Sequence, residues 1–148
     1  MHYQIMVTRF NNLTWFENCR WRENNNYIGC IYNSPIYIKD NIELKKEIYI
    51  IEMNNESNKI NGIGKIINYV HADKKYKIYE DRNYNRYTYK GNIRIDRENI
   101  IDKENLEKLE LRLFKGKNHL KRGQGIQNIP IDVHSKFCKF IINNFENL

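Results

Sequence analysis

The sequence predicts one small domain of the α+β class, with about five or six short strands in a mixed or closed sheet and about three helices. Two runs rich in Ile and Tyr, residues 47–53 and 59–70, lie on either side of a short polar segment and are typical of paired strands. Two later segments, 103–114 and 131–145, carry apolar residues at helical spacing. The length of 148 residues allows one hydrophobic core, so residues 1–148 are expected to form one domain.

The N-terminal third is predicted to contain a strand, a helix and an extended segment. The stretch HYQIMVTRF alternates in the manner of a first strand. Either Asn12 or Thr14 can cap the short helix that follows, because both side chains accept hydrogen bonds from free backbone N–H groups. The stretch GCIYNSPIYI is then expected to be extended, with an interruption at the turn-like residues Asn33, Ser34 and Pro35.

The strongest pattern in the chain predicts a β-hairpin. Its two strands would be residues 47–53 and 59–70, on either side of the polar turn NNESN. Gly62 and Gly64 inside the second strand predict a β-bulge or a tight bend, as at the corner of a barrel.

A second β-rich region is expected at residues 77–95, where YKIY and RYTYKGNIRI lie on either side of a charged turn at 80–85. The second of these stretches alternates basic and aromatic residues, so one of its faces would be basic. Further on, Asp102 is placed to cap the helix at 103–114, and Pro130 is placed to begin the last helix.

The charge of the chain favours an anionic partner. There are 25 Lys and Arg against 18 Asp and Glu, which gives a net charge of +7. Such an excess favours nucleic acid first and acidic membrane surfaces second. Asn, Ile, Lys and Tyr, which all use A/T-rich codons, are abundant together, so genome composition is the alternative explanation of the charge.

The cysteines and histidines argue against several kinds of site. Cys19, Cys30 and Cys138 are odd in number and form no C-x-x-C pair, which favours reduced thiols in an intracellular protein. The four histidines lack the spacing of a zinc motif, so no metal and no cofactor is expected. The sequence shows neither a signal-peptide core nor a long apolar run, so no membrane partner is expected.

A basic loop, GKNHLKRGQGI at residues 116–126, is the first candidate contact with nucleic acid. Gly123 and Gly125 would let the backbone approach a ligand closely, although the spacing is not that of a Walker phosphate loop. The alternative is a solvated connection between two helices. The candidate contacts in this loop are Lys117, His119, Lys121, Arg122 and Gln124.

The segment NYNRYTYKGNIRIDR is the second candidate. Its basic residues Arg86, Lys90 and Arg94 would contact phosphates, while the interleaved tyrosines offer surfaces on which bases stack. The alternative is that Tyr is simply a good strand residue and that Lys and Arg protect a sheet edge.

Two tryptophans near several polar side chains predict a pocket that holds a base. Trp21, and less so Trp15, would stack on the base, while Asn33, Ser34 and Asn54 would read its edge. The alternative is that both tryptophans belong to the core.

Arrangements that could carry catalysis are scarce. The serines lack the setting of a nucleophile elbow, and no Cys–His pair has a recognisable context. His119 with Glu104, Glu107 or Glu110 could form an acid–base set, but a solvated helix face is the simpler explanation of those glutamates. A binding domain is therefore expected, and a nucleic-acid-processing enzyme is the alternative.

The order of the segments IMVTRF, NLTWFENCRW, GCIYNSPIYI, EIYIIEMN and NKINGIGKI resembles the PUA-like superfamily, in particular its EVE and YTH branches. These domains often run a strand, a short helix, a Trp-bearing loop and then such a hairpin. The resemblance covers roughly the first half of the chain and is one of topology. Separately, EMNNESNKINGIGKI, NYNRYTYKG and LFKGKNHLKRGQGI are similar to a type of small protein of large nucleocytoplasmic DNA viruses.

The resemblance implies a compact PUA-like β-barrel that binds RNA, or a modified base or nucleotide, in an aromatic pocket. By position Trp21 would form the pocket wall, beside Asn33, Ser34 and Asn54. RNA is thus the expected partner ahead of DNA, in the cytoplasm of an infected host cell. The alternative is an interaction subunit of a viral RNA-handling complex, which would bind a viral or host protein.

Overall fold

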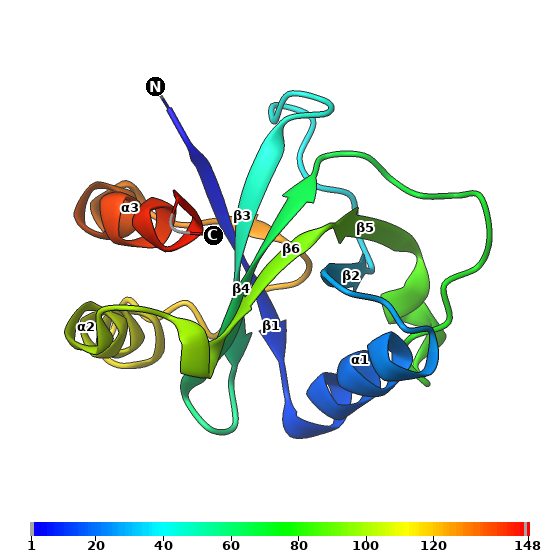
Figure 1. Ribbon diagram of the computed structural model, residues 1–148, viewed down its shortest axis with the longest axis horizontal. Helices are drawn as coiled ribbons and strands as arrows, with labels where there is room; N and C mark the ends of the chain where they lie inside the picture. The colour runs from blue at the N-terminus through cyan, green and yellow to red at the C-terminus, as the bar shows by residue number, and fades with distance from the viewer. Residues whose placement is uncertain (1, 147) are drawn as a thin grey trace.

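The computed structural model describes residues 2–146 and 148, and within them it contains three α-helices and seven strands, which confirms the α+β class (Figure 1). The strands are β1 (Gln4–Phe10), β2 (Cys30–Ser34), β3 (Glu47–Asn54), β4 (Lys59–Ile67), β5 (Tyr87–Gly91), β6 (Ile93–Asp96) and β7 (Gln127–Asn128). The helices are α1 (Asn12–Asn24), α2 (Lys103–Phe114) and α3 (Ile131–Glu146), with the short 3₁₀ helices η1 (Arg82–Asn85) and η2 (Arg97–Asn99). Across the described residues, none of the helices has both the length and the apolar character needed to cross a membrane.

The strands form a five-stranded sheet with the order β6-β4-β3-β1-β7 and a separate two-stranded sheet of β2 and β5. Strand β1 runs parallel to β3, and the other neighbours are antiparallel. Figure 1 shows α2 and α3 against one face of the large sheet, with α1 and the β2–β5 sheet on the other side. The described strands do not pair into a closed ring, so the barrel stays a prediction.

Alternate side chains of the central strands fill two hydrophobic cores. Ile5 and Val7 of β1 pack in the core that contains Leu109 of α2. Met6, which lies between them in sequence, packs in the second core with Tyr32 of β2. Successive side chains of a strand point to opposite faces, so a sheet covered on both faces requires nearly continuous apolar strands.

The predicted hairpin is confirmed as β3 and β4. Gly62 pairs with Glu52 and Ile60 pairs with Met53, which leaves Asn61 as the extra residue of a β-bulge. The predicted irregularity next to Gly62 is therefore confirmed. Strand β4 ends at Ile67 rather than at residue 70.

The strand predicted for YKIY is wrong. The segment 76–79 forms no strand, although Tyr76, Ile78 and Tyr79 are buried. Side-chain amides satisfy this backbone in place of a neighbouring strand. Asn33 donates to the Tyr76 carbonyl at 2.7 Å, and Asn85 donates to the Tyr79 carbonyl at 2.6 Å. The charged turn that follows contains η1.

The helix boundaries follow their caps. Helix α1 is capped one residue earlier than predicted, because the Asn11 side chain accepts from the Thr14 amide at 2.8 Å and the Thr14 hydroxyl accepts from the Asn11 amide. Asp102 caps α2 as predicted, by accepting from the Asn105 amide at 3.2 Å. Pro130 directly precedes α3, as its position in the sequence indicated.

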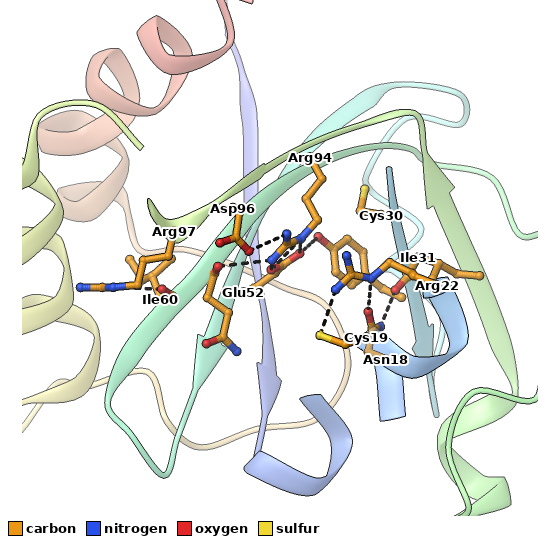
Figure 2. Close-up of polar contacts among 12 residues, drawn as sticks. Asn18, Cys19, Arg22, Cys30, Ile31, Glu52, Ile60, Arg94, Asp96 and Arg97 are labelled. Carbon is orange, nitrogen blue, oxygen red and sulfur yellow. Dashed lines mark hydrogen bonds and ion pairs between the residues drawn. The ribbon is translucent and has the colours of Figure 1, made fainter. Parts of the chain in front are cut away.

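A buried ion pair lies between the two sheets. Figure 2 shows the Arg94 guanidinium of β6 directed at Glu52 of β3, with Asp96 on its other side. Arg94 Nη2 lies 2.6 Å from Glu52 Oε1, and Tyr32 of β2 donates its hydroxyl to Glu52 Oε2 at 2.5 Å. The side chains of Arg94 and Glu52 are only 9% and 1% exposed.

Room for this pair comes from the glycines of β4. A Cβ at Gly62 would lie 2.6 Å from Arg94 Nη2, and one at Gly64 would overlap with the Tyr32 hydroxyl. The expectation that Arg94 lies on an exposed basic face is therefore wrong. Arg94 lies on strand β6, as the predicted alternation requires. Its side chain is buried, however, and its charge is paired with Glu52 and Asp96.

The thiol of Cys30 lies beside this cluster, and burial raises its pKa to about 12. In the unfolded chain a cysteine loses its proton near pH ~8.5, whereas the folded protein retains it. Between about pH 9 and pH 12 the unfolded state therefore binds fewer protons, and stability falls as the pH rises. The urea midpoint of a Cys30→Ala variant should fall less over this range than that of the parent protein. The buried tyrosines, whose pKa values are also raised, should leave a residual decline in both proteins, and identical declines would contradict the role of Cys30.

Candidate nucleic-acid interface

A cavity of about 210 Å³ lies where the basic loop meets the ends of the first two strands. Arg9 and Phe10 of β1, Asn11 and Thr14 at the start of α1, and Asn33 and Pro35 at the end of β2 form one part of its wall. Asn55 of the β3–β4 turn, Tyr79, and Tyr84 of η1 form another part. The loop residues Lys121, Gly123, Gln124 and Gly125 complete it.

The two glycines allow the loop to lie this close to the strands. Gly123 and Gly125 have φ angles of +126° and +72°, which residues with a side chain rarely adopt. A Cβ at Gly123 would lie 3.2 Å from Arg9 Nη1, and one at Gly125 would lie 2.8 Å from the Ser34 hydroxyl. The loop is therefore packed against the end of β2 rather than extended into solvent.

Arg9 carries a charge in the wall of this cavity and forms no ion pair with a carboxylate of the described residues. Its Nε donates to the carbonyl of Leu120 at 2.6 Å, while its Nη1 is buried and has no hydrogen-bond partner within the described chain. Burial lowers the pKa of the guanidinium, although an arginine stays charged at any physiological pH. The cavity lining contains Lys121 but no Asp or Glu. A buried cation in such a setting favours a ligand that is anionic or rich in hydrogen-bond acceptors.

Asn55 adds an acceptor to the same wall. Its Nδ2 donates to the carbonyl of Lys121 at 2.8 Å, which ties the loop to the β3–β4 turn. Its Oδ1 is buried and has no hydrogen-bond partner among the described residues. Two residues of the cavity wall thus each have a buried polar atom without a partner among the described residues, a donor on Arg9 and an acceptor on Asn55.

The three polar side chains predicted to read a base form hydrogen bonds with other residues of the protein. Asn33 lines the cavity, but its amide donates to Tyr76 and Asn85 and accepts from Thr88 at 2.6 Å. The Ser34 hydroxyl donates to the Ile36 carbonyl at 2.7 Å.

Asn54 accepts from two backbone amides of the β3–β4 turn with Oδ1, and its Nδ2 donates to Asn12. All three side chains hold the walls of the cavity in place. The polar atoms left over belong to Arg9 and Asn55 instead.

The two tryptophans lie elsewhere. The Trp15 ring packs against Phe10, and the guanidinium groups of Arg22 and Arg94 lie 5.3 and 5.1 Å from its centre. Trp21 packs edge-on against Tyr27, with ring centres 5.8 Å apart. Neither lines the cavity beside Asn33, which has the rings of Phe10, Tyr79 and Tyr84 in its wall.

A second depression, a groove of about 770 Å³, lies on the other side of η1. Arg86, one of the predicted phosphate contacts, lines it. The other cations of its wall are Lys74, Lys75, Lys77 and Arg82, and we call these five residues the cation cluster.

Lys90 is held away from this groove. Its Nζ donates to the Tyr76 hydroxyl at 3.0 Å and lies 4.8 Å from the centre of that ring. It lines a different hollow, beside Tyr27 and Tyr69. Of the three predicted strand cations, only Arg86 therefore belongs to the cation cluster.

The loop cations are divided as well. Lys121 and Gln124 line the cavity, while Lys117 and Arg122 are exposed and lie outside its wall. His119 is half-buried, and its Nδ1 accepts from the Lys121 amide at 3.1 Å. Their contacts with nucleic acid remain predictions.

The alternative acid–base set finds little support in the geometry. Glu110 is buried, bonds the Ile60 amide at 2.7 Å and forms an ion pair with Arg97. Glu104 forms a surface pair with Lys108. Within the described residues, no three His, Cys, Asp or Glu side chains are grouped closely enough to hold a metal ion.

Comparisons with protein-family models, with curated proteins and with solved structures found no match to this chain. The function is therefore argued from the cavity and the cation cluster alone.

Sequence reasoning missed Arg9, Asn55 and four members of the cation cluster. Arg9 is the penultimate residue of β1, and a cation near the end of an apolar strand is a weak signal of a site. The adjacent lysines Lys74 and Lys75 form a local concentration of charge that the sequence itself shows. Nothing in the sequence distinguishes Asn55 from its many neighbouring asparagines.

Proposed function

We propose that this protein is a non-enzymatic nucleic-acid-binding domain, with RNA favoured over DNA, that holds one base in the Arg9 cavity. The observation that carries the proposal is the pair of buried polar atoms, Arg9 Nη1 and Asn55 Oδ1, that have no partner in the described chain. A nucleobase edge offers acceptors and donors side by side, which complement one donor and one acceptor in a wall.

The size and lining of the cavity support a base rather than a larger ligand. Its volume of about 210 Å³ lies below the range of about 300–1,000 Å³ typical of small-molecule sites. The Tyr84 ring is 42% exposed at its rim and can stack on a base that enters. Lys121 supplies a second cation for the adjacent phosphate.

The proposal also covers the type of fold to which the two sheets belong. We infer that the two sheets correspond to the two sides of a PUA-like barrel. The order of β1, α1, β2 and the β3–β4 hairpin supports this, as does the close approach of β5 to β4 at Gly91.

An Arg9→Met variant tests the proposal. Methionine keeps the length and the apolar stem of the side chain but removes every donor. Losing a hydrogen bond from a charged group costs about 1.5–3 kcal/mol, so affinity for a short single-stranded RNA should fall by about 10- to 100-fold. Stability should change little, because the variant also removes a buried, unpaired charge. Fluorescence anisotropy measures the affinity, and urea denaturation measures the stability.

The matched control is Arg20→Met on the exposed side of α1, which removes the same charge outside the cavity. It should bind RNA with nearly the parent affinity. Equal losses in the two variants would contradict a role for the cavity. Failure of the parent protein to bind any single- or double-stranded nucleic acid would overturn the proposed function itself.

A second candidate is an interaction subunit that binds another protein. The observation that favours it is the exposed apolar side of α1, where Leu13 and Phe16 are 63% and 58% exposed. A stable protein partner that co-purifies after nuclease treatment, and is lost in a Phe16→Ser variant, would establish it.

A further inference from the structure

The five residues of the cation cluster line one groove and lie within one stretch of the sequence. Among the described residues, some of the Lys and Arg side chains elsewhere form ion pairs with carboxylates. Lys65 pairs with Glu47, Lys108 with Glu104, and Arg112 with Asp132. None of the five residues of the cation cluster forms such a pair among the described residues.

Three acidic side chains lie beside or within the same segment, Asp73, Glu80 and Asp81. Asp73 accepts the Tyr76 hydroxyl at 2.8 Å, which lowers the pKa of Asp73, and Asp81 accepts from the Asn83 amide at 3.0 Å. Asn85 and Thr88 complete the polar wall of the groove, and both are also bonded to Asn33. The segment 74–86 carries five cations against two carboxylates, Glu80 and Asp81, so its excess of positive charge favours an anion in the groove. Because five separate cations line the groove, a chain of phosphates can pair with more of them than a single phosphate can.

The groove and the Arg9 cavity share one wall. Helix η1 presents Arg82 and Asn85 to the groove and Tyr84 to the cavity. The bond from Asn33 to Asn85, 2.9 Å long, fixes this wall to β2. A base in the cavity and the phosphates in the groove would therefore lie on opposite sides of a single 3₁₀ turn.

We propose that the cation cluster binds the backbone of a single RNA strand whose base enters the Arg9 cavity across η1. This inference rests on the proposed function and adds to it the form of the nucleic acid. A duplex keeps its bases stacked and paired, and would need to unpair one of them before it could occupy both sites. A single strand has its bases and its backbone free to lie on either side of the wall.

The test uses a triple variant, Lys75→Gln, Lys77→Gln and Arg82→Gln, in the full chain. All three side chains are exposed, so their replacement should leave the urea midpoint unchanged. Binding to a single-stranded RNA is measured by anisotropy over a range of salt concentrations. Each phosphate contact contributes about 0.7 to the slope of log affinity against log salt for single strands. The slope should therefore fall by about 2, which corresponds to about 100-fold weaker binding in ~0.1 M salt.

The control is a second triple variant, Lys115→Gln, Lys136→Gln and Lys139→Gln, which has the same net charge but changes exposed residues of the α2–α3 side. The slope of log affinity against log salt for this control should differ from that of the parent by less than about 0.7, the contribution of one phosphate contact. Equal slopes in the two triple variants, with binding still dependent on Arg9, would overturn the role of the cation cluster and leave the proposed function standing.

Two further comparisons complete the test. The parent protein should bind the single strand more tightly than a duplex of the same sequence, and equal affinity would overturn the assignment to a single strand. Competition by vesicles of anionic lipid at equal phosphate concentration would also overturn it, because the groove would then recognise a charged surface rather than a strand. Absence of binding to any nucleic acid would instead refute the proposed function.

Discussion

A Glu52→Gln variant should lose about 3–5 kcal/mol of unfolding free energy, because it leaves the Arg94 guanidinium buried without its main carboxylate. Glutamine fills nearly the same volume, so the loss reports the charge rather than a cavity. Glu52 also accepts the Tyr32 hydroxyl, which joins β2 to the large sheet, and the glutamine amide can keep only part of this network. Urea denaturation at neutral pH, with the slope and midpoint fitted together, measures the loss.

The matched control is Asp132→Asn, which breaks the exposed pair with Arg112. Exposed ion pairs contribute little to stability, so its midpoint should stay close to that of the parent. If the two variants lost the same free energy, burial would not be what makes the Glu52 pair important.

A Gly91→Ala variant should displace the β2–β5 sheet from the large sheet. An added Cβ would overlap with the carbonyl group of Lys65 in β4, and backbone atoms cannot turn aside as a flexible side chain can. Overpacking costs about 1–3 kcal/mol where side chains yield, so we expect a loss at or above about 3 kcal/mol here. Urea denaturation measures the loss, and the near-ultraviolet circular dichroism of the buried tyrosines reports the displacement.

Gly116→Ala provides the comparison for this variant. Gly116 has a φ of +82°, but no atom lies within 4 Å of the position that its Cβ would take. Strain of the backbone alone costs about 1 kcal/mol. A Gly91→Ala protein no less stable than the Gly116→Ala protein would show that the two sheets can separate at little cost.

The elements that could be predicted are those whose causes are local. The β3–β4 hairpin follows from two apolar runs around a polar turn, and the bulge at Asn61 lies next to the glycine that indicated it. Asp102 caps α2 through its own neighbours in sequence. Each of these features needs only a few adjacent residues, so the sequence carries the information in one place.

The irregular segment at 76–79 could not be predicted, because its backbone is satisfied by amides that come from β2 and η1. Its Tyr and Ile residues are those of a strand, and no local signal shows that a neighbouring strand is missing. The exposure of Arg94 was misjudged for a similar reason. Its partner Glu52 lies more than one element away, in an apolar strand where a carboxylate looked incidental.

The candidate site was predictable only in part. Lys121, Gln124 and Asn33 were recognised by residue type and do line the cavity, but the free polar atoms belong to Arg9 and Asn55. These two residues combine a place in the cavity wall with a buried polar atom that has no partner among the described residues, and that combination depends on everything packed around them. Residue type alone cannot reveal it.

The placement of β1 has a consequence for how the chain reaches its native state. This strand lies near one terminus, yet its two neighbours are β3, which begins at Glu47, and β7, which begins at Gln127. Each pairing closes a long loop and must overcome the entropy of that closure, whereas the β3–β4 turn closes over four residues, 55–58. Contacts of high sequence separation slow folding, and β1 makes them on both edges. An inner strand of the sheet is thus also the one whose pairings the topology assigns to the late steps of folding.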